Sequence, residues 1–261
     1  MFTLSIDQLY VKFILSKRSN WDSFRTEYPR LFRSLYLGYR LYKRYRYLQY
    51  HRIYSRFSDF TMLSRRDYVS NLSLCEEFRH LRGAVVECGT WKGGMIAGIA
   101  TLFDDDRDYY LFDSFEGLPI AQDIDKDRWG QLAKTWQAKS RTNLRAEESF
   151  AQRAMLLSGT RNVHIIKGYF NKTLPKYNGE PIAILRADGD WYESTMDILI
   201  NLYPYVVKGG LTILDDYYYW EGCAKAVHDF LSRNQLADKI FQFNNGYAGL
   251  IKNGSSAPEN T

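Results

Sequence analysis

From Arg82 onward, short apolar runs alternate with segments of helical pattern, and this alternation restricts the fold more than any other feature of the sequence. Alternating strands and helices predict βαβ units, whose parallel strands are buried under helices on both faces of the sheet. Strands are expected at residues 84–88, 109–112, 163–167, 182–187, 211–214, 239–243 and 248–252, and helices at 93–103, 193–203 and 221–233. Asn245-Gly246, between the last two strands, predicts an antiparallel hairpin. The expected fold class is therefore α/β, with a doubly wound, mostly parallel, Rossmann-like sheet of seven strands.

Residues 1–60 differ from the rest of the chain in composition and are expected to form a separate helical segment. Residues 1–66 hold 14 Lys/Arg and four Asp/Glu, so this part is strongly basic, whereas the remainder is mildly acidic. Tyr36, Tyr39 and Tyr42 recur at helical spacing among these basic residues. Such a helix can pack on the rest of the chain, contact a second subunit, or lie against an anionic surface. The α/β domain is expected at 61–252, followed by a flexible polar tail at 253–261.

About fifty residues separate the second and third expected strands, where one crossover helix would suffice. This interval is charged and carries Trp129, Trp136 and Phe150. We interpret residues 116–160 as an insertion with helices of its own that covers the mouth of the site as a lid. A surface excursion without a function is the alternative.

Two acidic clusters follow apolar runs, and they are the strongest chemical signal in the sequence. Asp188-Gly189-Asp190 follows the run at 182–187, and Asp215-Asp216 follows the run at 211–214. Parallel strands that end side by side would bring these carboxylates to the crevice where open α/β sheets bind ligands. Crowded carboxylates repel one another unless a cation or a proton lies among them, so the pattern favours a Mg²⁺ site. Strand-end acids that simply face water are the alternative.

Asp190 stands two residues beyond Asp188, on the turn that leaves the same strand. It could remain free of the metal and take a proton from a substrate hydroxyl as a general base. Alternatively, Asp190 only caps the helix that begins near Glu193.

A glycine-containing turn follows the first strand in Glu87-Cys88-Gly89-Thr90-Trp91-Lys92-Gly93-Gly94. Gly89 would allow a tight turn and close approach of a ligand, and Gly93 would let a helix begin with its free N–H groups facing the crevice. Glu87 could face a ligand amine. A purely structural turn remains open. Asp113, after the second strand, stands where an acid often binds ribose hydroxyls, although a turn aspartate is the alternative.

Five motifs, in order, resemble the macrocin O-methyltransferase family over about residues 61–252. They are residues 86–94, 113–119, 168–175, 185–195 and 209–217. The resemblance implies a class I S-adenosylmethionine (SAM) methyltransferase that depends on Mg²⁺, is often dimeric and methylates sugar hydroxyls. It implies that the turn with Glu87, Gly89, Thr90 and Gly93 holds the methionine part of SAM, that Asp113 and Ser114 hold the ribose, and that Gly168-Tyr169-Phe170 lies near the adenine, with Asp188 close to the cofactor. It also implies that Asp188, Asp215 and Asp216 ligate Mg²⁺ and that Asp190 is the general base.

The expected partners are a small-molecule or glycan acceptor with neighbouring hydroxyls and a second copy of the chain, without nucleic acid. Cys75, Cys88 and Cys223 form no metal-binding or disulfide pattern, so we expect reduced thiols in a cytoplasmic protein. Residues 1–60 could add peripheral contact with the inner face of a membrane. Two other functions stay open: a metal-dependent glycosyltransferase that uses Asp188-Gly189-Asp190 as a DxD motif, and a scaffold that docks through its basic segment.

Overall fold

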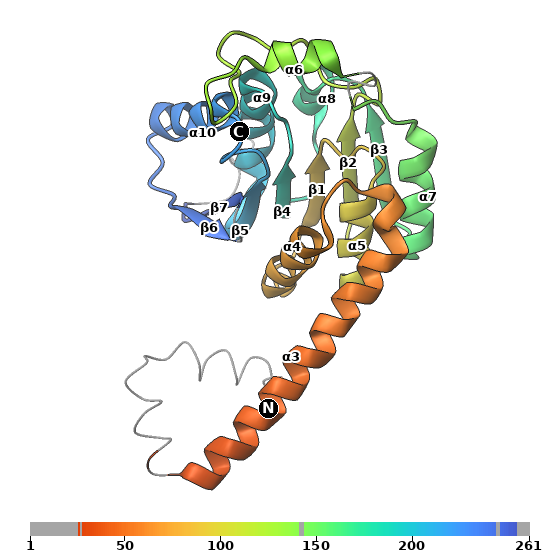
Figure 1. The fold of residues 1–261 in the computed structure, drawn as a ribbon, viewed down its shortest axis with the longest axis vertical. Helices are drawn as coiled ribbons and strands as arrows, with labels where there is room; N and C mark the ends of the chain where they lie inside the picture. The colour runs from red at the N-terminus through yellow and green to blue at the C-terminus, as the bar shows by residue number, and fades with distance from the viewer. Residues whose placement is uncertain (1–25, 27, 141–143, 244–245, 255–261) are drawn as a thin grey trace. The chain divides into compact units, whose positions relative to one another are not determined.

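The computed structural model describes residues 26, 28–140, 144–243 and 246–254 (Figure 1). The chain divides into two compact units, Met1–Gln49 and Tyr50–Thr261. Helix α3 (Pro29–Phe57) covers the range in which the tyrosine spacing predicts a helix, while the earlier part of the predicted basic segment lies outside the described residues. Within the described part of the chain, every helix is too short or too polar to cross a membrane.

A seven-stranded sheet forms the centre of the second unit, as the sequence predicts. Its order is β3-β2-β1-β4-β5-β7-β6, which Figure 1 shows from right to left. Strands β1 to β5 are parallel, and β7 is antiparallel to both β5 and β6. The strands are β1 (Ala84–Cys88), β2 (Tyr109–Asp113), β3 (Val163–Lys167), β4 (Ile182–Ala187), β5 (Val206–Leu214), β6 (Ile240–Phe243) and β7 (Tyr247–Ile251). The strand order reverses between β1 and β4, so a ligand crevice is expected at their carboxyl ends.

Two hydrophobic clusters cover the two faces of the sheet and give the domain three layers. One contains residues of α4, α5 and α7, and the other contains residues of α9 and α10. The helices are α4 (Arg65–Glu77), α5 (Gly94–Phe103), α6 (Ala133–Lys139), α7 (Glu148–Ser158), α8 (Phe170–Thr173), α9 (Tyr192–Leu202) and α10 (Glu221–Arg233), with 3-10 turns η1 (Ser58–Phe60), η2 (Leu174–Lys176) and η3 (Tyr203–Tyr205). The five residues of β1 are all buried, as expected for a central parallel strand.

Strand β5 is longer than the sequence predicts. It begins at Val206 and not at residue 211, although Gly209-Gly210 has the composition of a turn. The pairing of β4 with β5 shifts register between Ile182 and Ile184, and Gly209 has φ +79°. The glycines therefore form an irregularity inside the strand instead of ending it.

The interval between β2 and β3 contains two helices of its own, α6 and α7. Helix α7 packs against α5, and its residues Ala151, Ala154 and Met155 belong to the core, so the second half of the interval is a crossover helix. The first half runs past the carboxyl ends of the strands, where Figure 1 shows α6. There Trp191 Nε1 donates a hydrogen bond to the Pro119 carbonyl oxygen at 2.9 Å. Residues 116–140 thus lie beside the acidic loop after β4, and their role as a lid stays a prediction.

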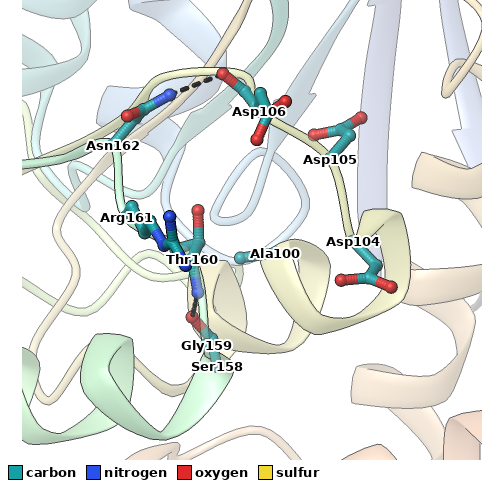
Figure 2. Close-up of a pocket in the computed structure, with 9 residues that line it drawn as sticks. All are labelled: Ala100, Asp104, Asp105, Asp106, Ser158, Gly159, Thr160, Arg161 and Asn162. Carbon is teal, nitrogen blue, oxygen red and sulfur yellow. Dashed lines mark hydrogen bonds between the residues drawn. The ribbon is translucent and has the colours of Figure 1, made fainter.

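A hollow at the opposite, amino-terminal edge of the sheet contains none of the predicted site residues. It lies where α5 and α7 end and where β2 and β3 begin (Figure 2). Its lining includes Asp104, Asp105, Asp106, Arg161 and Asn162, and the Asn162 side chain donates a hydrogen bond to the Asp106 carbonyl oxygen at 2.6 Å. The contact between Asn162 and Asp106 joins the turns that precede β3 and β2.

Candidate active site

The carboxyl ends of β1, β4 and β5 are held side by side by main-chain hydrogen bonds beyond the strands themselves. The Asp188 N–H donates to the Cys88 carbonyl oxygen at 3.0 Å, and the Asp215 N–H donates to the Ala187 carbonyl oxygen at 3.1 Å. As a result, Asp188, Asp215 and Asp216 each offer a carboxylate oxygen, and these atoms lie within 4.8 Å of one another. The two acidic clusters that are separate in the sequence therefore meet at the predicted edge. Oxygen atoms in such a group suit a hard divalent cation.

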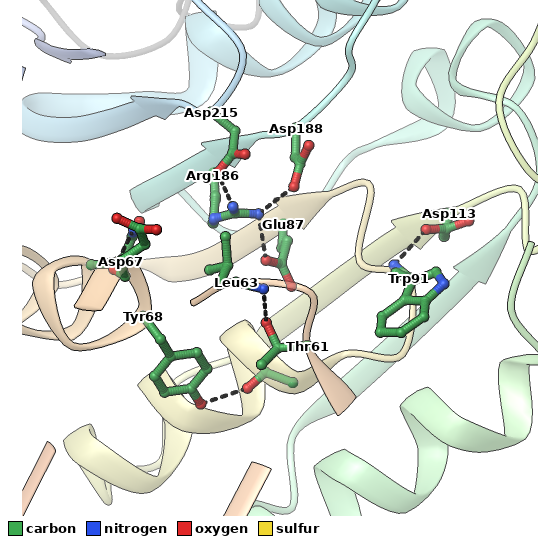
Figure 3. Close-up of polar contacts among 12 residues, drawn as sticks. Thr61, Leu63, Asp67, Tyr68, Glu87, Trp91, Asp113, Arg186, Asp188 and Asp215 are labelled. Atoms are coloured by element: carbon green, nitrogen blue, oxygen red, sulfur yellow. Dashed lines mark hydrogen bonds and ion pairs between the residues drawn. The ribbon is translucent and has the colours of Figure 1, made fainter. Parts of the chain in front are cut away.

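Arg186, which the sequence reasoning missed, lies beneath this cluster and bonds to two of its carboxylates. Its Nη1 donates to Glu87 Oε1 at 3.0 Å and to Asp188 Oδ2 at 2.7 Å, and its Nη2 donates to Asp215 Oδ1 (Figure 3). The Arg186 side chain is 3% exposed. Glu87 and Arg186 are direct partners in the register of β1 and β4. The sequence did carry a signal for this pair, because Glu87 and Arg186 are charged residues inside two otherwise apolar strands. Buried charges are normally paired with each other.

The cluster holds more carboxyl groups than basic groups to balance them. Burial raises the pKa of Asp190 well above its usual value, and the charges of Asp188 and Asp215 raise it further. Burial also raises the pKa of Asp215 to about 7, although Arg186 opposes this rise. For Asp216, burial and the charge of Asp190 both raise the pKa of the carboxyl group. This excess of negative charge in a buried site is what a bound divalent cation would offset.

Asp190 lies against the cluster and does not cap the helix that follows it. Its backbone, with φ +54°, turns sharply, and its N–H donates to Asp216 Oδ2 at 2.9 Å. Trp220 Nε1 donates to Asp190 Oδ1 at 3.2 Å. The N–H of Tyr192, the first residue of α9, instead donates to Asp125 Oδ1 at 2.8 Å. The capping interpretation of Asp190 was therefore wrong, because an aspartate from the 116–140 segment takes that position.

The turn after β1 brings the backbone of Gly89 against the loop after β4. Gly89 has φ +85°, and a Cβ atom at this position would lie 2.0 Å from the Asp188 carbonyl oxygen. Gly93 is the N-cap of α5, with φ +75°. Thr90 is buried, and its Oγ1 has no hydrogen-bond partner among the described residues. The turn therefore requires glycine for structural reasons, and the buried Thr90 hydroxyl retains its capacity to form a hydrogen bond.

We expect Gly89→Ala to destabilise the protein by roughly 2–5 kcal/mol, because the new methyl group adds an overlap with Asp188 to the cost of a positive φ. Gly159 has the same φ of +85°, but a methyl group there would meet no atom of the described residues within 4 Å, so Gly159→Ala is the matched control. The control should lose only about 1–2 kcal/mol. Denaturant unfolding measures both values, and equal losses would show that the approach to Asp188 is not tight.

Asp113 lies at the end of β2 and holds the neighbouring turns together. Its Oδ2 accepts the Trp91 N–H at 2.7 Å, and its Oδ1 accepts the Phe115 N–H at 2.7 Å. Ser114 Oγ donates to the Gly117 carbonyl oxygen at 2.8 Å, within its own loop. The structural role of a turn aspartate is thus present, and a carboxylate, with about four acceptor sites, can still accept a ligand hydroxyl.

The loop after β3 lies next to Asp113. The Gly168 N–H donates to the Asp113 carbonyl oxygen at 2.8 Å, and Gly168 has φ +141°. Tyr169 is 38% exposed, whereas Phe170 packs against the core cluster of α9 and α10. The predicted residues Gly89, Thr90, Gly93, Asp113, Ser114 and Gly168–Phe170 therefore lie along one continuous edge of the sheet, at the ends of β1, β2 and β3. Glu87 lies inside β1, where it is buried and paired with Arg186.

A family model described as "Macrocin-O-methyltransferase (TylF)" matches residues 59–247, which include all five sequence motifs. The chain belongs to the macrocin O-methyltransferase family. It is accordingly a SAM-dependent O-methyltransferase, as the resemblance implied. This result removes the glycosyltransferase and scaffold alternatives.

Similar proteins support this assignment in sequence and in structure. Demethyldecarbamoylnovobiocin O-methyltransferase of Streptomyces niveus is 34% identical over 66% of this chain and 68% of its own length. Mycinamicin III 3''-O-methyltransferase of Micromonospora griseorubida is 33% identical over 67% of this chain and 71% of its own length. The solved structure of the O-methyltransferase NovP superimposes with a TM-score of 0.63 at 29% identity, covering 75% of this chain and 83% of that one. The calicheamicin methyltransferase CalS11 shares the fold, with a TM-score of 0.58 at 16% identity. The superposition covers 96% of this chain and 94% of that one.

Proposed function

We propose that this enzyme transfers the methyl group of SAM to a hydroxyl group of a sugar in a natural-product or surface-glycan intermediate, with the help of a Mg²⁺ ion. The observation that carries the proposal is the group of carboxylate oxygens from Asp188, Asp215 and Asp216, within 4.8 Å of one another, with Asp190 beside it. A sugar acceptor is supported by a further relative, which is 34% identical over 66% of this chain and 68% of its own length. It is the 8-demethyl-8-(2,3-dimethoxy-alpha-L-rhamnosyl)-tetracenomycin-C 4'-O-methyltransferase of Streptomyces olivaceus, whose name contains a rhamnosyl group.

The donor half of the proposed site is the edge formed by β1, β2 and β3. Glu87, Gly89, Thr90 and Gly93 would hold the methionine part of SAM, Asp113 and Ser114 the ribose, and Gly168, Tyr169 and Phe170 would lie near the adenine. Two features support this arrangement: Thr90 Oγ1 has no partner within the described part of the chain, and the Asp113 carboxylate can accept a further hydrogen bond. Asp188, adjacent to Gly89, would stand between the donor and the metal.

Asp113→Ala should weaken SAM binding by about 10- to 100-fold, because hydrogen bonds to a charged group contribute roughly 1.5–3 kcal/mol each. Calorimetric titration with SAM measures this effect. Asp113→Asn keeps an oxygen that can accept one of the two loop N–H groups, so it separates loss of the ligand contact from collapse of the loop. Unchanged affinity in both variants would rule out a ribose contact by Asp113.

In the acceptor half, Asp188, Asp215 and Asp216 would supply oxygen ligands to the metal. A bound Mg²⁺ would supply Lewis-acid activation of the acceptor hydroxyl. Asp190, whose N–H donates to Asp216 Oδ2 beside the proposed metal ligands, would accept the hydroxyl proton. Trp220 would hold the Asp190 carboxylate in place through its indole N–H.

Aromatic side chains around Asp190 support a sugar as the acceptor. Trp191 and Trp220 pack edge to face with ring centroids 4.9 Å apart, and Trp220 contacts Tyr219 with centroids 4.8 Å apart. Tyr219 and Trp129 remain exposed, at 39% and 65%. Exposed rings beside a polar site offer apolar faces to sugar C–H groups, while neighbouring sugar hydroxyls would suit the metal.

The proposed reaction is tested by incubating the protein with SAM, Mg²⁺ and a panel of free sugars, nucleotide sugars, glycosides and catechols. Mass spectrometry should detect one added methyl group on a sugar-bearing acceptor, and the transfer should stop when the metal is chelated. Methylation of catechols alone, or transfer that is unaffected by chelation, would contradict the proposal.

We further propose a homodimer in the cytoplasm, with residues 1–60 available for peripheral membrane contact. The dimer is what the family resemblance implies, and the excess of Lys and Arg over Asp and Glu in residues 1–66 supports the membrane contact. Sedimentation of the full chain alone tests the dimer, and a monomer would contradict it. Sedimentation with vesicles of anionic lipid tests the membrane contact, and a chain that stays free of the vesicles would contradict that part.

A further inference from the structure

Arg186 lies beneath the acidic cluster and not among its exposed atoms. The side chains of Glu87 and Arg186 are 2% and 3% exposed, whereas those of Asp215 and Asp188 are 16% and 27% exposed. Exposure therefore increases from the guanidinium group toward the carboxylates. A cation that enters from the crevice meets the carboxylates of Asp188 and Asp215 before it reaches Arg186.

Arg186 donates to one oxygen of each of two carboxylates. It donates no hydrogen bond to the second oxygen of either carboxylate. It contacts Oδ2 of Asp188 and Oδ1 of Asp215, which follow different strands. A guanidinium group is planar and its N–H groups point in fixed directions, so it sets the orientation of both carboxylates together. Glu87, the partner of Arg186 across the β1–β4 register, accepts a third hydrogen bond and fixes the guanidinium group in turn.

We propose that Arg186 is a positioning residue that orients Asp188 and Asp215 for metal binding in the proposed site. This inference depends on the proposed function, since it needs a divalent metal at these carboxylates. Groups that orient metal ligands from behind contribute strongly to metal sites, and their replacement typically lowers metal affinity by about 10- to 100-fold.

The positive charge of Arg186 could instead oppose metal binding. The two roles therefore predict opposite changes in metal affinity when Arg186 is replaced. If Arg186 only neutralised the carboxylates, it would compete with the metal, and its removal would tighten metal binding. If it orients the carboxylates, removal of its fixed N–H groups must weaken metal binding even when the positive charge is kept.

Mn²⁺ binding to the full-length protein without SAM, followed by electron paramagnetic resonance of the free ion, distinguishes the two expectations. Arg186→Lys keeps the charge but loses the planar group, and we expect its Mn²⁺ affinity to fall about 10-fold or more. Arg186→Gln, which also loses the charge, should weaken binding as well. Arg107→Lys is the matched control, because Arg107 is mostly buried and pairs with Asp105 at the other edge of the sheet. Its Mn²⁺ affinity should not change.

The outcomes separate this inference from the proposed function. Wild-type protein that binds no Mn²⁺ would overturn both. Wild-type binding that persists unchanged in Arg186→Lys, or that tightens in Arg186→Gln, would overturn the positioning role alone. If Arg186→Gln fails to fold, Arg186→Lys decides the question. As a second readout, excess Mg²⁺ should restore the turnover of Arg186→Lys, and failure of this rescue would also contradict a role in positioning metal ligands.

Discussion

Asp190→Asn is expected to lower turnover by about 10²- to 10⁴-fold, the range usually lost when a general base is removed. Asparagine has nearly the same size and keeps an oxygen that can accept the Trp220 indole N–H. The backbone N–H that donates to Asp216 is also unchanged. The variant should therefore bind SAM and divalent metal about as well as the wild type, and it should lose only the ability to take the acceptor proton.

Single-turnover kinetics with saturating SAM and Mg²⁺ measures this loss directly. Asp197→Asn is the matched control, because Asp197 lies on α9, a few residues beyond the acidic loop, and is part-buried. The control should retain normal turnover. If Asp190→Asn also retained it, the proton would have to leave through another group.

Asp215→Asn is expected to reduce turnover at low Mg²⁺ by about 10²- to 10³-fold, because the Lewis-acid contribution of a bound metal is several kcal/mol. Asparagine removes the charge of one proposed ligand, and it also leaves the Nη2 group of the buried Arg186 without its carboxylate partner. Chelation of the wild-type enzyme should produce a loss of similar size that added Mg²⁺ reverses.

Turnover measured against Mg²⁺ concentration tests the expectation, together with Mn²⁺ binding in the absence of acceptor. SAM affinity should change little. Asp105→Asn is the control, since Asp105 is likewise paired with an arginine but lies at the amino edge of the sheet. An Asp215→Asn enzyme with the Mg²⁺ dependence of the wild type would remove Asp215 from the metal site.

The fold and the meeting of the acidic clusters could be predicted because both follow from strand patterning. Apolar runs such as 182–187 are nearly continuous, as buried parallel strands require, and Asn245-Gly246 lies between two short strands that do pair antiparallel. Once β4 and β5 are neighbours, Asp188 and Asp215 at their carboxyl ends have to lie close together.

The parts that sequence reasoning did not predict depend on tertiary contacts. Gly209-Gly210 has the composition of a turn, but pairing with neighbouring strands keeps it inside β5. Whether α7 is a lid helix or a core helix is decided by its contact with α5. The roles of Arg186 and Asp125 require knowledge of which groups face each other across the sheet and across the acidic loop.

The position and the partner of Arg186 could nevertheless have been predicted from the sequence. Side chains two residues apart in a strand share a face, so Arg186 had to lie on the same face as Asp188. An arginine inside an otherwise apolar strand also needs a buried partner, and Glu87 inside the adjacent strand is such a partner.

The buried carboxylate of Asp125 limits how this enzyme can be re-engineered. It accepts N–H groups from both Gln122 and Tyr192, and so it joins the stretch at 116–140 to the first turn of α9. A chimera that imported this stretch from another methyltransferase would have to bring an aspartate at the same place. Without it, the graft would loosen the very turn that presents Asp190, and a change meant to alter acceptor choice would also impair proton removal.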